Sequence, residues 1–306
     1  MNGPHRITCI VNCGAGSSRA AEETARLRAI FAQNNLEVEL VEAEGPEVTA
    51  AAVRAVKSGS TLVVAVGGDG TLNAVANVLV GTDVALGVVP LGTFNHFAKD
   101  MKIPLDAETA IATLATGEIT RIDVGEVNGR IFLNNSSLGL YPWLVRQREK
   151  LQQAGASKWR AFASALLSLA DYYPRLYVRL KTAERHERRR ETSFVFIGNN
   201  QYEVSGARLG ERQMVNRGEL WVCRAPRAGQ LKLLLLGLQA LLGFKPRELE
   251  TMASGELWIE TKSKRARVST DGEVSVFDSP LHYISRPQAL KVMVPAGCAV
   301  PTATSG

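Results

Sequence analysis

Three glycines and one aspartate stand close together in the segment VVAVGGDGTLNAVANVL, residues 63–79. Four apolar residues precede Gly67-Gly68-Asp69-Gly70-Thr71, and apolar residues at helical spacing follow it. Glycine permits positive φ and close approach of the backbone, and the N–H groups of a helix N-terminus attract anions. The segment therefore predicts a phosphate site between a strand and a helix, where Thr71 caps the helix or donates to a phosphate oxygen.

Asp69 extends this prediction to a metal, because a carboxylate repels bound phosphates unless a divalent cation lies between them. The loop thus implies a metal–nucleotide complex with Mg²⁺ as the expected ion. The alternative is a tight strand-to-helix turn in which Asp69 caps the helix, and an isolated GGDG sequence does not decide between the two. The Walker pattern is absent and the glycine loop at 14–19 does not complete GxGxxG, so a P-loop NTPase and a dinucleotide-binding Rossmann domain are not supported.

The elements that would position this loop alternate between strand and helix over roughly the first 120 residues, as in a three-layer α/β domain. The run TLVVAV shows no polar alternation, which is typical of a central parallel strand covered on both faces. Ser18 and Asp106 are candidate helix caps. We expect strands over 6–12, 36–43, 61–66 and 84–90, and helices after 18, over 47–57, after 71 and over 106–116.

After Arg121 the pattern changes to a second, mostly β domain. A hairpin with Asn128-Gly129 as its turn comes first, and a helical region over about 143–172 follows. Strand-like runs occupy 175–181, 192–200, 218–225, 255–262 and 266–275. These features predict two domains, 1–122 and 123–306, with the option that the last residues return to the first domain.

The composition is that of an ordinary globular protein with a mild basic excess. The 306 residues carry a net charge of +6, which suits an anionic membrane surface, nucleic acid or a phosphorylated substrate but requires none of them. The chain has four cysteines and no CxxC pair, so the sequence does not support a structural zinc site. No N-terminal signal core is evident, and the apolar stretch 231–244 is shorter than the ~20 residues of a membrane span, so we expect a cytoplasmic protein.

Three further motifs accompany the glycine loop: NCGAG at 12–16, PLGTFNHFAKD at 90–100 and TDGEVS at 270–275. Together with VGGDGTLN they resemble the catalytic domain of the diacylglycerol kinase and sphingosine kinase family, over almost the whole chain. The resemblance implies an α/β nucleotide-binding domain at 1–122 and a β-sandwich domain for the lipid substrate at 123–306, with ATP between them and Mg²⁺ as cofactor. NAD kinases share the GGDGT loop on a similar fold and are kept as an alternative.

The resemblance also assigns residues to the nucleotide. Cys13 stands where the family usually has proline, and His96 replaces a frequent aspartate. Asp69 would lie near Mg²⁺, and Asn95 would also line the catalytic cleft. The residues expected to bind the nucleotide are Asn12, Gly16, Gly67, Gly68, Gly70, Thr71, Asn73, Thr93 and Asn95.

The expected catalytic residues are Asp69, Asp271 and Glu273. By resemblance Glu273, in the motif Asp-Gly-Glu, is the general base for the acceptor hydroxyl, whereas the motif alone also suits a simple β-turn. Asp123 matches an acidic position of the magnesium network, and a structural role is its alternative. Arg217 stands where some relatives carry a carboxylate, so we expect no structural magnesium site in the second domain.

The sequence thus predicts an ATP- and Mg²⁺-dependent lipid kinase that phosphorylates a hydroxyl of diacylglycerol or a related membrane lipid. We expect peripheral contact with the membrane and no nucleic-acid partner, and a homodimer is left open. The stretch 231–244 is a membrane dock or a buried helix, and the basic segment 185–191 is a solvated hairpin tip or a contact for acidic headgroups. Alternatives are a sphingoid or other long-chain alcohol kinase, an NAD kinase, and a non-catalytic nucleotide or lipid sensor.

Overall fold

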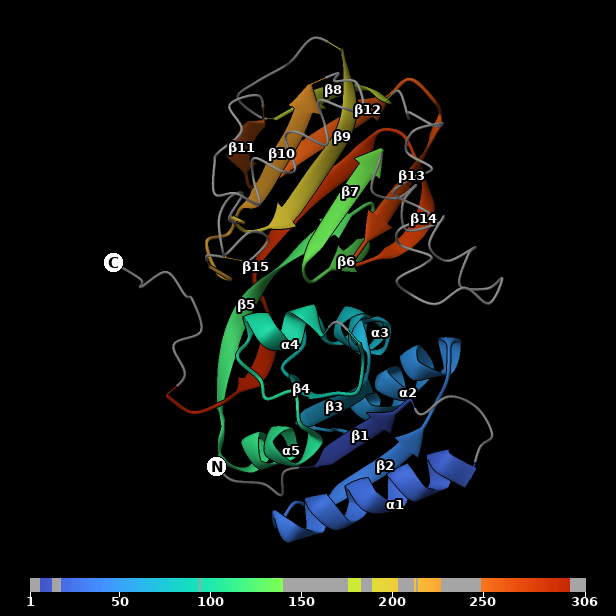
Figure 1. Ribbon diagram of the computed structural model, residues 1–306, viewed down its shortest axis with the longest axis vertical. Coiled ribbons are helices and arrows are strands. Elements are labelled where there is room, and N and C mark those ends of the chain that lie inside the picture. Colours follow the sequence, from blue (N-terminus) through green and yellow to red (C-terminus); the bar gives the residue numbers. More distant parts are fainter. Residues whose placement is uncertain are drawn as a thin grey trace. The chain divides into compact units, whose positions relative to one another are not determined.

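The chain forms two compact units in the computed structural model (Figure 1). Unit 1 comprises Met1–Val124 and Pro287–Gly306, and unit 2 comprises Gly125–Arg286. Two strands, β5 (Glu118–Val127) and β15 (Leu281–Val294), run from one unit into the other, and the sequence-based boundary at 122/123 falls inside β5. The structure describes residues 6–12, 18–93, 95–139, 176–182, 189–202, 212, 214–226 and 249–297.

Unit 1 is built on parallel strands. β1 (Ile7–Val11) pairs with β2 (Val38–Glu42) and β3 (Leu62–Gly67), and β3 pairs with β4 (Ala85–Pro90). β15 then adds to β4 in parallel. Successive residues of β1, β3 and β4 are buried, so both faces of this sheet are covered, as the apolar run at β3 predicted.

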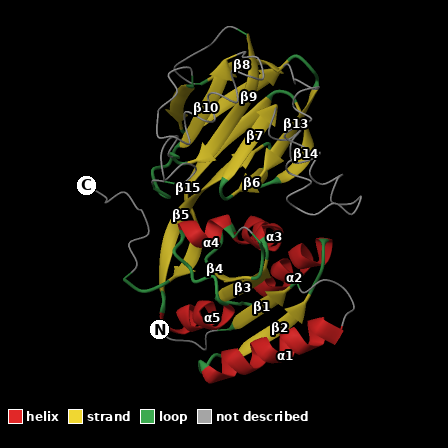
Figure 2. Cartoon of the chain, viewed as in Figure 1, coloured by secondary structure: helices red, strands yellow, loops and turns green. Residues whose placement is uncertain are grey.

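The helices supply the two covers (Figure 2). One pair packs α2 against α3 and the other packs α1 against α5, and α3 and α5 both contact β4. The predicted three-layer α/β architecture of the first part of the chain is confirmed. The helices are α1 (Ser18–Gln33), α2 (Pro46–Lys57), α3 (Asp69–Leu79), α4 (His96–Asp100) and α5 (Ala107–Thr116).

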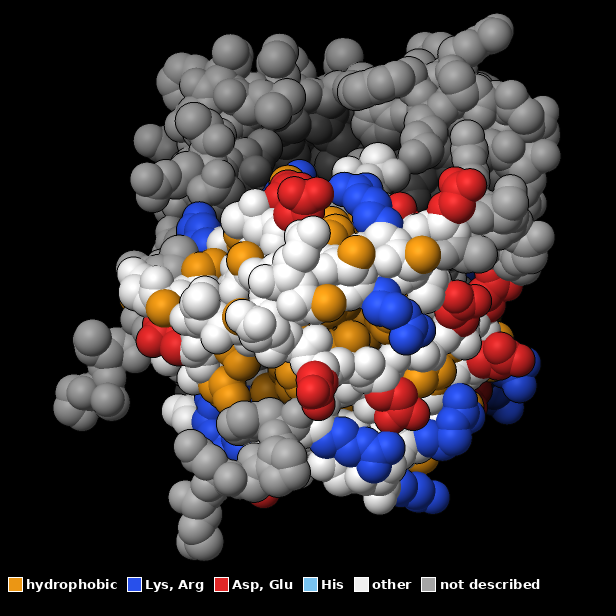
Figure 3. Space-filling model, turned by 90° about the horizontal axis from the view of Figure 1, so that it is seen from below, with side chains coloured by type: hydrophobic (Ala, Val, Ile, Leu, Met, Phe, Trp, Pro, Cys, Tyr) orange, Lys and Arg blue, Asp and Glu red, His pale blue; other side chains and the backbone are white. Residues whose placement is uncertain are grey.

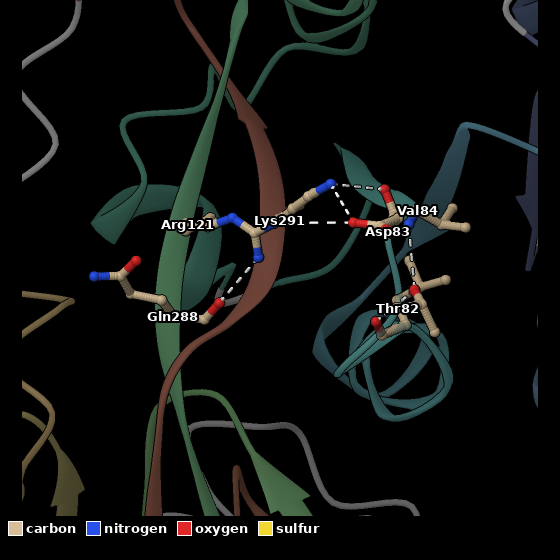
Figure 4. Close-up of polar contacts among 7 residues, drawn as sticks. Thr82, Asp83, Val84, Arg121, Gln288 and Lys291 are labelled. Atoms are coloured by element: carbon tan, nitrogen blue, oxygen red, sulfur yellow. Dashed lines mark hydrogen bonds and ion pairs between the residues drawn. The ribbon is translucent and has the colours of Figure 1, made fainter.

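The return of β15 completes unit 1 (Figure 4). Lys291 Nζ lies 2.8 Å from Asp83 Oδ1 and 3.2 Å from the Asp83 carbonyl oxygen. The Arg121 guanidinium lies 3.9 Å from the same carboxylate and donates to the Gln288 carbonyl oxygen at 3.4 Å. The Lys291 ammonium holds the pKa of Asp83 below its ordinary value. These contacts join the end of β15 to β5 and to the start of β4.

Unit 2 opens with the predicted hairpin, in which Asn128 (φ 46°) and Gly129 (φ 84°) both have positive φ and connect β5 to β6 (Arg130–Phe132). The strands that follow pair in the order β14-β13-β7-β9-β8-β12-β15, with β10 between β9 and β11. Their bounds are β7 Asn135–Gly139, β8 Leu176–Lys181, β9 Arg190–Asn199, β10 Leu220–Pro226, β11 Glu250–Ser254, β12 Glu256–Thr261, β13 Arg265–Thr270 and β14 Glu273–Asp278.

A single apolar cluster forms the main core of unit 2. Val127 and Phe132 enter it from the first hairpin, and Tyr283 enters it from β15, which pairs with β5 of that hairpin. Side chains of β7, β8, β9, β10, β12 and β13 fill the rest. Since strands along the whole order share one core, the sheet curls around it. The predicted strand-rich second part is therefore confirmed.

Several predictions fall on parts of the chain that the structure does not describe. They are the loop residues Cys13 and Gly16, the helix over 143–172, most of the basic segment 185–191 and the apolar stretch 231–244. Among the described helices, none has the length and apolar character needed to cross a membrane. On the face drawn in Figure 3, the described Lys and Arg side chains alternate with Asp and Glu and form no uniform basic patch.

Candidate functional site

The glycine loop forms a close backbone contact between the ends of β3 and β4. A Cβ built on Gly92 would lie 2.7 Å from Gly68 Cα, and one on Gly67 would lie 2.7 Å from Thr71 Oγ1. The Leu91 N–H donates to the Gly67 carbonyl oxygen at 2.9 Å. Gly67 and Gly68 do not have positive φ, so close approach is the reason that the structure gives for glycine at these two positions.

Asn12 joins the end of β1 to the same loop. Its backbone N–H donates to the Val66 carbonyl oxygen, and its side-chain Nδ2 donates to Thr71 Oγ1 at 2.8 Å. Thr71 is buried and accepts this bond, so its own hydroxyl hydrogen stays available for another acceptor. The structure thus brings together three predicted nucleotide residues, Asn12, Gly67 and Thr71, at the carboxyl ends of adjacent parallel strands.

Asp69 lies at the first position of α3, after Gly68, which is the N-cap residue. The cap makes no side-chain hydrogen bond, so the alternative in which Asp69 is the capping residue is wrong. Within the part of the chain that the structure describes, the Asp69 carboxylate has no hydrogen-bond or ion-pair partner, and the residue is half-buried. Its carboxylate is therefore free to interact with a cation beside the helix N-terminus.

This arrangement fits Mg²⁺ bound mostly by non-protein ligands. No group of three or more His, Cys, Asp or Glu side chains suited to a metal occurs among the described residues. Mg²⁺ is commonly held by one or two carboxylates together with phosphate oxygens and water. A lone carboxylate next to an anion-attracting loop supplies that minimum, so Asp69 is the residue that would hold the ion.

The remaining predicted residues of this loop cluster differ in their surroundings. Asn95 is buried, has φ 50° and donates from Nδ2 to the Gly92 carbonyl oxygen at 2.9 Å, so its side chain closes the turn after β4. Thr93 and His96 are exposed, and His96 begins α4. Asn73 lies one helical turn after Asp69 on the same side of α3 and is half-buried. It is the member of this group best placed beside Asp69.

Asp123 lies on β5 and is fully buried. Its Oδ1 accepts the backbone N–H of Gln288 at 2.8 Å, and Gln288 has a positive φ of 50°. The carboxylate therefore holds the backbone of β15 at the residue where φ is positive. No described metal cluster joins Asp123 to Asp69, and a metal role for Asp123 stays a prediction.

In unit 2 the Asp-Gly-Glu motif forms a two-residue hairpin turn. Thr270 and Glu273 are paired, and Asp271 (φ 48°) and Gly272 (φ 90°) both have positive φ. The Asp271 carboxylate accepts three backbone N–H groups, from Leu133 at 2.6 Å, Asn134 at 2.8 Å and Asn135 at 2.9 Å. The turn is thereby fastened to the connection between β6 and β7. These contacts give Asp271 a structural task beside the catalytic role that the sequence predicts.

Glu273 begins β14, and its side chain is about half exposed. Its Oε2 lies 2.6 Å from Arg130 Nη2, and Arg130 Nη1 donates to Ser275 Oγ at 2.5 Å. Sequence reasoning missed Arg130 because its partner lies 143 residues away. The only local signal was a cation at the start of a strand, directly after the Asn128-Gly129 turn.

Arg217, which stands where some relatives carry a carboxylate, contacts neighbouring side chains of unit 2. Its guanidinium lies 3.7 Å from Glu219 and donates to Gln201 Oε1 at 3.1 Å. Its backbone N–H donates to the buried Asn200. The positive charge is therefore balanced by a neighbouring carboxylate of the same segment.

Comparison with known proteins finds similarity in the α/β part of the chain. Residues 6–127 match the diacylglycerol kinase catalytic domain. Diacylglycerol kinases from Staphylococcus saprophyticus and Staphylococcus epidermidis are 36% and 39% identical to this chain over 95 residues, which are 30% of this chain and 31% and 30% of those proteins. The similarity thus spans less than a third of the length of these curated relatives.

Solved structures extend the likeness of fold to nearly the whole chain. A diacylglycerol kinase from Bacillus anthracis superposes with a TM-score of 0.69 at 17% identity, over 95% of this chain and 97% of that chain. Another structure from the same organism gives 0.76 at 19% identity, over 96% and 99%. The fold of both units is therefore shared with these proteins. The segment 6–127, which holds the glycine loop and Asp69, is the part of the chain that matches the diacylglycerol kinase catalytic domain.

Proposed function

We propose that the protein is an ATP-dependent lipid kinase that transfers the γ-phosphoryl group to a hydroxyl of diacylglycerol or a related membrane lipid. The observation that carries the proposal is that the Asp69 carboxylate, at the first position of α3 and beside the Gly68–Gly92 backbone contact, has no hydrogen-bond or ion-pair partner among the described residues. This arrangement lies within the segment that matches the diacylglycerol kinase catalytic domain. Peripheral contact with a membrane is part of the proposal because the acceptor is a membrane lipid.

Each residue then has a defined task. The N–H groups at the start of α3 and the Thr71 hydroxyl bind phosphate oxygens. Mg²⁺, held by Asp69, would neutralise phosphate charge. Glu273 accepts the proton of the acceptor hydroxyl. The hydroxyl oxygen forms the new bond to the γ-phosphorus, the bond to the bridging oxygen breaks, and ADP leaves with that electron pair.

The test uses the full chain with Mg²⁺, radiolabelled ATP and separate acceptors: vesicles with diacylglycerol, vesicles with sphingosine, a membrane-lipid extract, and NAD. ATP binding is measured separately by calorimetry. Label in diacylglycerol that disappears in Asp69→Asn, while the melting temperature stays unchanged, supports the proposal. Full activity of Asp69→Asn would overturn the metal assignment.

The other acceptors separate the alternatives. Label in sphingosine alone would move the substrate to a sphingoid base, and label in NAD alone would identify an NAD kinase. Bound ATP with no labelled acceptor would favour a nucleotide sensor. Arg265→Ala serves as a matched surface control, because Arg265 and its partner Asp278 are both strongly exposed.

A further inference from the structure

We infer that Arg130 is a positioning residue for Glu273: its guanidinium holds Oε2 and leaves Oε1 as the oxygen that accepts the proton of the acceptor hydroxyl. The inference rests on the proposed function and adds a residue to it. No local sequence motif marks Arg130. Arg130 begins β6, and it lies 143 residues before Glu273 in the sequence.

The Arg130 guanidinium contacts two side chains of β14. Arg130 Nη2 lies 2.6 Å from Glu273 Oε2, and Nη1 lies 2.5 Å from Ser275 Oγ. Glu273 and Ser275 are two residues apart on β14, so their side chains share one face of the strand. A planar guanidinium can donate in two directions at once, which fixes its own orientation and that of the carboxylate. Glu273 Oε1 has no hydrogen-bond partner among the described residues.

The segment that carries Arg130 also contacts the turn that precedes Glu273. The N–H groups of Leu133, Asn134 and Asn135 donate to Asp271, and the Asp271 N–H donates back to the Asn135 carbonyl oxygen at 2.8 Å. Residues 130–135 therefore contact the turn at two places: at Asp271, through its carboxylate and its backbone N–H, and at the carboxylate of Glu273. These contacts thus hold the turn that precedes Glu273 as well as its carboxylate.

Stability alone does not account for the pair. The side chains of Arg130 and Glu273 are 36% and 53% exposed, and ion pairs at such exposure contribute little to folding. Catalysis, in contrast, depends strongly on orientation, because a base must meet its proton in a narrow range of geometry. A contact that contributes little to folding but restricts a base is expected to act on kcat.

The test measures lipid phosphorylation by Arg130→Ala, Arg130→Lys, Glu273→Gln and the double variant Arg130→Ala/Glu273→Gln, with Arg265→Ala as the control for loss of an exposed arginine. We expect Arg130→Ala to lower kcat by about 10- to 100-fold, the size of effect that misplacement of a catalytic group produces. The KM for ATP, the affinity for ATP and the melting temperature should stay near the wild-type values. Arg130→Lys keeps the charge but not the fork and should restore only part of the rate.

Two readouts separate positioning from a structural role. Millimolar guanidinium should partly rescue kcat of Arg130→Ala and leave Arg265→Ala unchanged. The double variant should be no slower than Glu273→Gln, because Arg130 acts through Glu273. A wild-type rate in Arg130→Ala, or a loss that adds fully to that of Glu273→Gln, overturns the inference and leaves the proposed function intact. A wild-type protein that phosphorylates no lipid overturns both.

Discussion

Gly92 illustrates how a single hydrogen atom in place of a side chain shapes the candidate site. A Cβ at this position would lie 2.7 Å from Gly68 Cα and 2.7 Å from Asn95 Oδ1. Backbone cannot yield as a flexible side chain can, so Gly92→Ala must separate the loops that follow β3 and β4. The two loops form the same candidate phosphate site, and their separation should therefore be measured as lost ATP affinity.

We predict that Gly92→Ala weakens ATP binding by tenfold or more, which corresponds to about 1.4 kcal/mol. The free energy of unfolding should fall by about 1–3 kcal/mol, the usual cost of overpacking. Calorimetric titration with ATP and thermal denaturation measure the two effects. Gly255→Ala is the control, because a Cβ there meets its nearest atom at an ordinary 3.7 Å. Unchanged ATP binding in Gly92→Ala would contradict the role of the loop contact.

Asp271 allows a second prediction at this scale. Removal of its carboxylate in Asp271→Ala leaves three backbone N–H groups without that acceptor. Each partly buried donor left unpaired costs about 1–3 kcal/mol, so we expect the free energy of unfolding to fall by at least about 2 kcal/mol. Urea denaturation measures the change. A variant that unfolds like the wild type but phosphorylates no lipid would show that Asp271 is purely catalytic.

The position of a site residue could be predicted where its motif is local in the sequence. It could not be predicted where its partner lies far away in the chain. Asp69 and the glycines stand in one short motif between a strand and a helix, so their place at the edge of the sheet followed from the sequence. Arg130 and Glu273 meet only through the pairing of strands far apart in the chain. Nothing in the sequence indicated that the Asn95 side chain would donate to the Gly92 carbonyl oxygen of its own turn, and its role in a cleft stays a prediction.

At the scale of elements, α5 shows how a cap ties helix stability to pH. The Asp106 carboxylate accepts the backbone N–H of Thr109 at 2.9 Å and its hydroxyl at 2.5 Å. These hydrogen bonds, the hydroxyl first, lower the pKa of Asp106 below its ordinary value of 3.8. A carboxyl whose pKa is lowered by folding stabilises the protein above its unfolded value, and this contribution is lost as the pH falls through the folded value.

We therefore predict that Asp106→Ala lowers the melting temperature at neutral pH, and that the difference from the wild type shrinks as the pH falls below about 3.8. Asp106→Asn should keep much of the cap, because asparagine is a good N-cap residue, but lose this pH dependence. Thermal scans over a series of acidic buffers measure both variants. A constant difference between Asp106→Ala and the wild type at all these pH values would contradict the linkage.

The bounds of helices and strands were predicted best where the hydrophobic periodicity agreed with capping and turn residues. The start of α5 after Asp106 and the Asn128-Gly129 turn were both predicted, because an N-cap residue and an Asn-Gly pair are short-range signals. β11 was not predicted as a strand. Its residues Glu250–Ser254 are mostly exposed and partly polar, so only their pairing with β10 defines them. The sequence of β11 lacks the alternation of apolar and polar residues by which a strand can be predicted.

At the scale of the whole molecule, the chain order does not match the division into units. Unit 1 takes its strand beside β4 from the C-terminal part of β15, after the chain has passed through all of unit 2. The sequence left open that the last residues return, but no composition change marks Pro287 as the point of return. β15 is one continuous strand across Pro287, so no loop or turn in the sequence marks the boundary between the units.

The returning segment carries part of the core of unit 1. Leu290, Val292 and Val294 are all buried to 1% exposure or less, and Gln288 supplies a backbone N–H to the buried Asp123. Burial of a valine or leucine contributes about 1.5–3 kcal/mol. Three such residues therefore contribute about 5–9 kcal/mol, which is comparable to the ~5–15 kcal/mol of an entire domain.

We predict that a fragment ending at Val124, although it holds nearly all of the segment that matches the catalytic domain, does not fold cooperatively. The same fragment joined by a short Gly-Ser linker to Pro287–Gly306 should unfold cooperatively and bind ATP. Because Asp123 and Gln288 are hydrogen-bonded, the two ends lie close enough for such a linker. Circular dichroism melting and ATP titration measure both fragments. A sharp transition in the shorter one would show that unit 1 folds without β15, and that the returning strand serves to connect the units.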